Sequence, residues 1–100
     1  MKKIRLSLEY KCFPIWLLNE NGDIIDNNSP EELKSNDILY NKLVSMQEKY
    51  NSLFLDDGIE FKYIGFSNVQ DEEAFMAEVE IIYSEMKEKL QHKYHFEIMR

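Results

Sequence analysis

The sequence comprises 100 residues with a mass of 12.0 kDa, a size at which a chain forms one domain, so we expect a single domain over residues 1–100. Hydrophobic residues make up 44% of the chain and there are only 3 glycines and 2 prolines, which excludes disordered and collagen-like chains, and no apolar run approaches the roughly 20 residues of a membrane-spanning helix. The 19 acidic and 12 basic side chains give a net charge of -7, which repels phosphate backbones and excludes nucleic acid as an expected partner.

Three strands are predicted in the first 26 residues. Apolar and polar side chains alternate over residues 3–10, which predicts a half-buried strand. The apolar run 13–18 contains Pro14, so the second strand starts near this proline or lies on a sheet edge. Asn21-Gly22 lies between Leu17-Leu18 and Ile24-Ile25, which predicts a hairpin with a type I′ turn and positive φ at both central residues.

A first helix is predicted from Ser29 to about Leu53. Ser29 supplies a capping hydroxyl, Pro30 suits the first helical position, and Glu32 completes a capping box. The helix continues through an apolar stripe at helical spacing, formed by Leu39, Leu43, Met46, Tyr50 and Leu53. Ser35-Asn36-Asp37 would interrupt this helix or cap it again.

A further strand, helix and strand are predicted in the second half. Asp56-Asp57-Gly58 predicts a turn, and residues 59–66 are rich in the β-branched and aromatic side chains typical of a strand. A capping box from Ser67 to Gln70 precedes an apolar stripe of Phe75, Val79, Ile82, Met86 and Leu90, which predicts a second helix. Alternation over residues 94–98 predicts the last strand.

The order of these elements is β-β-β-α-β-α-β, which predicts an α+β fold. We expect a mainly antiparallel sheet of about five strands with the two amphipathic helices packed on one face. No repeat, linker or change of composition divides the chain.

The residue types that serve in catalysis or metal binding, histidine and cysteine, occur here without a known catalytic or metal-binding spacing. His92 and His95 are expected on the surface, in a turn and on the outer face of a strand, without the spacing of a metal site. Cys12 is the only cysteine, so it makes no internal disulfide, and we expect it to be a small buried apolar residue. Nothing resembles a nucleophile elbow or a phosphate-binding glycine loop, so we expect no catalytic residue, no metal and no cofactor.

Acidic residues are the strongest indication of a binding surface. Residues 71–88 contain seven carboxylates and one cation, Lys87, and acidic turns occur at 23–26 and 56–57. Such a surface suits a basic protein partner. Tyrosine and tryptophan concentrate in interfaces, and Trp16, Tyr40, Tyr50 and Tyr83 are the candidates for outward-facing aromatic residues. The predicted partner-binding residues are Asp23, Asp26, Asp56, Asp57, Glu72, Glu73, Glu80 and Tyr83.

Residues 4–10 (IRLSLEY), 12–16 (CFPIW), 21–23 (NGD) and 61–66 (FKYIGF) together resemble small immunity proteins of bacterial toxin/immunity systems, of the contact-dependent or polymorphic kind. The resemblance implies a cytoplasmic, non-enzymatic protein that binds one cognate toxin domain and blocks it. The acidic charge fits a basic toxin such as a nuclease. Arg5, Ser7 and Glu9 interrupt the apolar core that an export signal would need, in keeping with a cytoplasmic protein.

Two other function classes remain open. The first is a structural or regulatory subunit that forms a homodimer through an exposed strand edge. The second is a small enzyme in which a carboxylate converges with His92 or His95 in a cleft.

Overall fold

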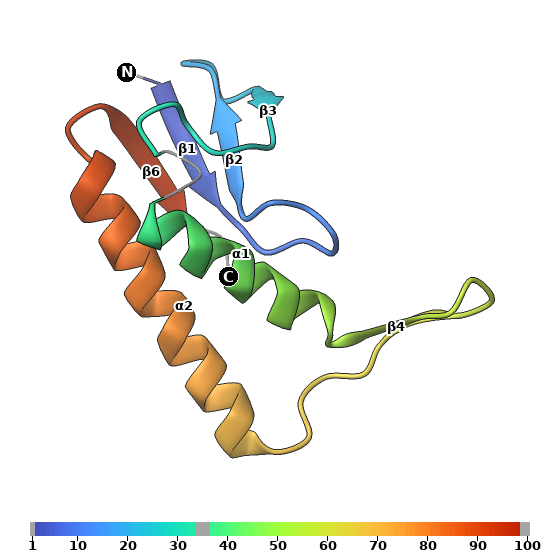
Figure 1. Ribbon diagram of the computed structural model, residues 1–100. Coiled ribbons are helices and arrows are strands. Elements are labelled where there is room, and N and C mark those ends of the chain that lie inside the picture. Colours follow the sequence, from blue (N-terminus) through green and yellow to red (C-terminus); the bar gives the residue numbers. More distant parts are fainter. Residues whose placement is uncertain (1, 34–36, 99–100) are drawn as a thin grey trace.

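The computed structural model describes residues 2–33 and 37–98, which form two helices and six strands (Figure 1). The elements are β1 (Lys2–Leu6), β2 (Ile15–Leu18), β3 (Ile24–Asp26), α1 (Ile38–Asn51), β4 (Phe54–Asp56), β5 (Phe61–Tyr63), α2 (Val69–Leu90) and β6 (Tyr94–Ile98). Four strands form one sheet in the order β3-β2-β1-β6, and β4 and β5 form a separate two-stranded sheet. The α+β class is confirmed.

The main sheet has four strands rather than the predicted five or so, and it is mixed, because two of its three pairings are antiparallel and one is parallel. β1 pairs antiparallel with β2 but parallel with β6, where Arg5 lies opposite Glu97. β1 also ends at Leu6 rather than at Tyr10. The next backbone contact is a hydrogen bond from Ser7 N to Pro14 O, and because Pro14 has no N–H it cannot extend the ladder further. β2 accordingly begins directly after Pro14, which confirms the first of the two predicted alternatives, a start near the proline.

The β2–β3 hairpin is confirmed, but its turn is not of type I′. Among the described residues of this loop only Gly22 has a positive φ, of 89°, so Asn21 does not adopt the predicted conformation. Gly22 N instead donates to Asn19 O at 3.0 Å. The Asn19 side chain also accepts hydrogen bonds from the backbone N–H groups of Asn21 and Asp23, at 3.0 and 2.9 Å. Asn19 thus organises the turn through its side chain.

Helix α1 begins at Ile38, and the prediction that it begins at Ser29 is wrong. The Ser29 hydroxyl donates to Leu33 O, and Leu33 N donates to Pro30 O, so this segment forms a turn. The turn buries Leu33 in the core. A helix in this segment would have no apolar stripe with which to pack against the core. Asp37 is the N-cap and accepts from Leu39 N at 2.8 Å, which confirms the predicted recapping. Ser35 and Asn36 lie outside the described residues.

The strand predicted over residues 59–66 is limited to β5 and does not join the main sheet. It pairs with β4 across a short loop, with Phe54 opposite Tyr63 and Asp56 opposite Phe61. Closing a short loop costs less conformational entropy than pairing with a distant sheet edge, which favours this local hairpin. Helix α2 follows, capped by Asn68 rather than Ser67, since the Asn68 side chain accepts from Asp71 N at 2.8 Å.

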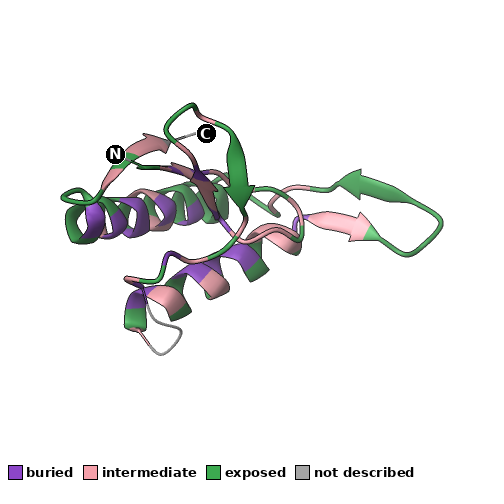
Figure 2. Cartoon of the chain, turned by 90° about the horizontal axis from the view of Figure 1, so that it is seen from above, coloured by how far each residue is buried: buried purple, intermediate pink, exposed green. Residues whose placement is uncertain are grey.

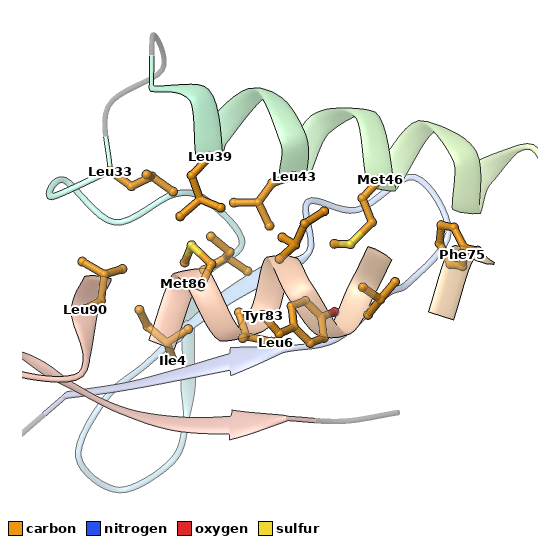
Figure 3. Close-up of a cluster of buried hydrophobic side chains, with 13 residues drawn as sticks. Ile4, Leu6, Leu33, Leu39, Leu43, Met46, Phe75, Tyr83, Met86 and Leu90 are labelled. Atoms are coloured by element: carbon orange, nitrogen blue, oxygen red, sulfur yellow. The ribbon is translucent and has the colours of Figure 1, made fainter. Parts of the chain in front are cut away.

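Both helices pack on the same face of the main sheet, as predicted (Figure 2). The close-up in Figure 3 shows Ile4 and Leu6 of β1 facing side chains that both helices contribute. The alternation predicted for β1 and the two helical stripes therefore identified the core correctly. The buried cluster comprises Ile4, Leu6, Ile15, Leu33, Leu39, Leu43, Met46, Phe75, Val79, Ile82, Tyr83, Met86 and Leu90.

Candidate functional site

The β4–β5 hairpin projects away from the rest of the molecule (Figures 1 and 2). We call residues 54–63 the aromatic arm. The ring of Phe54 stacks on that of Phe61, with centroids 5.5 Å apart, and both rings contact Tyr10 at 4.8 and 4.9 Å. Tyr50 and Tyr63 contact Phe54 from α1 and from β5. Aromatic packing at the base therefore holds the arm against the body.

The arm exposes large apolar side chains. Ile59 at its tip is 97% exposed and Tyr63 is 59% exposed, and Phe61 and the adjoining Ile64 are also exposed. Single exposed apolar residues are ordinary, but a group of them on a projecting element marks an interaction site. Phe61 and Tyr63 were not among the aromatic residues expected on the surface, so their exposure was missed. Asp57-Gly58 between two short aromatic strands was the signal for a separate hairpin.

Carboxylates surround the apolar surface of the arm. Asp57 Oδ1 accepts from the backbone N–H groups of Ile59 and Glu60 at 3.0 and 2.8 Å, and these bonds lower the pKa of Asp57. Asp56 accepts from the Tyr10 hydroxyl at 3.4 Å and lies 3.7 Å from Lys11 Nζ. Asp57 therefore shapes the tip, and Asp56 joins the arm to the loop before β2.

The first half of α2 adds a second group of carboxylates. Asp71, Glu72 and Glu73 are exposed near the helix N-terminus, where the helix dipole favours negative charge. Glu80, two turns further on, is half-buried. Glu78 pairs with Lys49 of α1 at 2.9 Å, so its charge is locally neutralised.

The whole net charge of the chain resides in residues 54–80, which we call the acidic segment. It contains eight of the 19 carboxylates and, in Lys62, one of the 12 cations. The remaining residues therefore hold eleven of each sign and are formally neutral. The aromatic arm and the first half of α2 thus form the acidic part of an otherwise charge-balanced protein.

A cavity of about 410 Å³ lies between the base of the arm, the end of α1 and helix α2. Three tyrosines line it, Tyr50, Tyr63 and Tyr83, together with Phe66, Phe75 and Met76. Its carboxylates are Glu9 and Glu72. Burial raises the pKa of the Tyr50 phenol, and the negative charge of Glu9 raises it further, so this hydroxyl keeps its proton.

The structure brings some of the predicted partner-binding residues together and separates others. Asp56 and Asp57 lie on the arm, and Glu72 and Tyr83 both line the cavity. Asp23 and Asp26 are exposed on the β2–β3 hairpin, which lies apart from the arm (Figure 1). Glu73 and Glu80 belong to α2 outside the cavity lining.

The aromatic residues expected on the surface are mostly covered. Tyr83 is only 2% exposed, so the prediction of an outward-facing ring is wrong, because its position on α2 faces the sheet. Trp16, Tyr40 and Tyr50 are half-buried. Cys12 is half-buried rather than buried.

Residues 2–33 and 37–98 contain neither a metal-binding cluster nor a membrane-spanning helix. In that part of the chain no three His, Cys, Asp or Glu side chains are grouped to hold a metal ion. Neither helix described there combines the length and apolar character that crossing a membrane requires. His92 and His95 are both exposed.

These features define a small α+β protein whose net negative charge lies in residues 54–80 and whose projecting arm exposes a group of large apolar side chains. The sequence matches the model of the Serratia CdiI immunity protein-like family over residues 2–100, so the chain belongs to this family. The resemblance to immunity proteins of toxin/immunity systems is thereby confirmed. No curated protein sequence matches the chain.

Proposed function

We propose that this protein acts in the cytoplasm as an immunity protein that binds one cognate protein toxin and neutralises it without catalysing a reaction. Membership of the immunity protein-like family supports the toxin-neutralising role. The observation that carries the proposed binding mode is the acidic segment, in which the entire net charge surrounds an exposed aromatic arm.

A basic toxin is the partner that this surface fits. A nuclease, for example, uses cations to hold its nucleic acid, and an acidic protein competes for the same cations. Interface energy concentrates in aromatic anchors surrounded by polar residues, and the arm has this arrangement. Asp56, Asp57, Glu72, Glu73 and Glu80 are the proposed contact carboxylates. Asp23 and Asp26 lie on the separate hairpin, so we assign them only to long-range attraction.

The test uses a candidate toxin domain, sought among the genes that neighbour this one, with an unrelated toxin as control. Co-expression with the wild-type protein should restore growth against the first toxin and not against the second. Failure to bind or to protect against the first toxin contradicts the proposed function.

Charge reversal tests the binding mode separately. Glu73→Lys lies in the acidic segment, and Glu88→Lys is an exposed change on the same helix outside it. Glu73→Lys should slow association with the toxin at low salt more than Glu88→Lys does, because charges near an interface steer the encounter. The difference should disappear at 1 M salt, where the Debye length falls to about 3 Å. Equal effects of the two reversals would show that the acidic segment is not the binding surface.

The mass of the protein alone in solution tests the alternative of a homodimer. A monomer leaves the arm free for the toxin. A dimer that Phe61→Ala dissociates would instead assign the exposed apolar surface to self-association.

A further inference from the structure

We propose that the cavity beneath the aromatic arm receives a single arginine side chain of the toxin. This inference rests on the proposed function and assigns one specific contact within it. The cavity, of about 410 Å³, lies at the small end of the range of pockets that enclose ligands, about 300–1,000 Å³. It lies at the base of the arm, and half of the residues that line it belong to the acidic segment.

The walls of the cavity suit the flat guanidinium group. Tyr50 of α1, Tyr63 of the arm and Tyr83 of α2 contribute rings from three separate elements. The faces of aromatic rings attract cations, and arginine stacks on them more often than lysine does. Phe66, Phe75 and Met76 provide apolar surface that the arginine methylene groups would cover.

The charge of the cavity lining selects a cation. Glu9 and Glu72 are its two carboxylates, and no Lys, Arg or His is among the described residues that line it. Neither carboxylate forms an ion pair with another described residue. An anion would be repelled here, and a purely apolar side chain would remove water from the two carboxylates without replacing its hydrogen bonds. An arginine supplies both the positive charge and the donors.

Two neighbouring cavities provide an internal comparison. Each is about 480 Å³, and each already includes a cation of the protein itself, Lys49 in one and Arg5 in the other. Lys49 is paired with Glu78, and Arg5 is paired with Glu97. Each of these cavities therefore already contains a cation of the protein, whereas no described Lys, Arg or His lines the cavity beneath the arm.

A small-molecule titration tests the cavity without the toxin. The probe is Nα-acetyl-L-arginine methylamide, and the citrulline analogue is a control of nearly the same shape without the charge. In NMR spectra of the full chain, the arginine probe should shift the Met76 methyl and Tyr63 ring signals saturably at millimolar concentration. The citrulline analogue should not. Equal shifts from both probes, or none from either, would overturn the proposal, and tighter binding of the lysine analogue would overturn the choice of arginine.

Two adjacent carboxylates supply the matched variants. Glu72 lines the cavity and Glu73 does not, although both are exposed and both changes remove one negative charge. Glu72→Gln should weaken binding of the arginine probe about two- to fivefold, the range for an exposed ion pair, and Glu73→Gln should weaken it less. An equal effect of the two changes would show that the probe responds to the overall negative charge of the segment and not to the cavity, which would overturn the cavity assignment.

Measurements with the toxin separate this inference from the proposed function. Binding of the toxin to the wild-type protein, with dissociation accelerated more by Glu72→Gln than by Glu73→Gln, supports both. Toxin binding that Glu72→Gln weakens no more than Glu73→Gln does sustains the proposed function and overturns the cavity assignment. Absence of toxin binding to the wild-type protein overturns the proposed function, and the probe titration then decides the chemistry of the cavity by itself.

Discussion

The phenol of Tyr94 in β6 donates a hydrogen bond of 2.8 Å to the carboxylate of Glu32, in the turn that precedes α1. Lys93 Nζ lies 3.7 Å from the other carboxylate oxygen. Burial and the contact with Glu32 raise the pKa of Tyr94 to about 12. Burial acts to raise the pKa of Glu32 as well, but the hydrogen bond from Tyr94 and the charge of Lys93 help to lower it overall. This pair joins the last strand to a turn 62 residues earlier.

Removing the Tyr94 hydroxyl should therefore lower stability. Tyr94→Phe keeps the ring and loses the hydrogen bond, so we expect the free energy of unfolding in urea at pH 7 to fall by about 0.5–1.5 kcal/mol. Tyr10→Phe is the control, because its hydroxyl makes an exposed contact of 3.4 Å with Asp56. An equal loss in the two variants would show that the Tyr94–Glu32 bond has no special stabilising role.

Stability should also depend on pH at both ends of the range. The hydrogen bond from Lys89 and that from Leu39 N lower the pKa of Asp37, and the pKa of Glu32 is lowered as well. Carboxylates of this kind stabilise the fold above their ordinary pKa values of 3.8 and 4.5, and the stabilisation is lost as the pH falls below them. Because the pKa of Tyr94 is raised from 10.0 to about 12, its contribution is complete below pH 10 and is lost as the pH rises through 12.

Urea midpoints measured across this range should show a plateau with a decline on each side. Glu32→Gln and Asp37→Asn should each make the acid decline shallower than in the wild type. Variants whose acid decline matches that of the wild type would contradict the assignment to these two carboxylates.

Two adjacent isoleucines of α2 test the position of the core. Ile82 is 2% exposed and Ile81 is 59% exposed. Ile82→Ala should lower the free energy of unfolding by about 2–5 kcal/mol, because it leaves a cavity among packed side chains. Ile81→Ala should change it by no more than about 0.5 kcal/mol. Similar losses at both positions would mean that the helix is rotated from the orientation described.

The β2–β3 turn should be sensitive to the conformation of one glycine. Gly22 has a φ of 89°, and an added Cβ would meet no atom within 4 Å, so only the backbone conformation penalises a side chain. Gly22→Val should cost about 1 kcal/mol or more, and Gly22→Asn should cost less because asparagine tolerates positive φ. An unchanged melting temperature for Gly22→Val would contradict this turn.

The elements that sequence reasoning predicted well are those whose burial repeats along the chain. Alternation in β1 and β6 and the stripes of α1 and α2 reflect which side faces the core, so they identified Leu43 and Ile82 as buried. The prediction that α1 starts at Ser29 was wrong because a capping box is a local signal. The burial of Leu33 depends on residues far away in the sequence. The parallel pairing of β1 with β6 has no local signal at all.

Only the charged residues of the candidate site could be predicted from the sequence. The acidic part of α2 can be read directly because helix residues 71–80 are consecutive in the sequence. The exposure of Phe61 and Tyr63 could not be predicted, because aromatic residues usually lie in cores. Only the local pairing of β4 with β5 directs these two side chains outward. The cavity combines side chains from the loop before β2, α1, the arm and α2, which only the folded chain brings together.

The parallel pairing of β1 with β6 also links the order of synthesis to the order of folding. Arg5 leaves the ribosome 92 residues before Glu97, its partner across the two strands. At ordinary rates of translation this interval lasts roughly 5 to 20 s. Throughout it, the nascent sheet has β1 as an open edge, which can pair with another chain. The growing polypeptide therefore has an unpaired edge at β1 that the finished protein covers with β6.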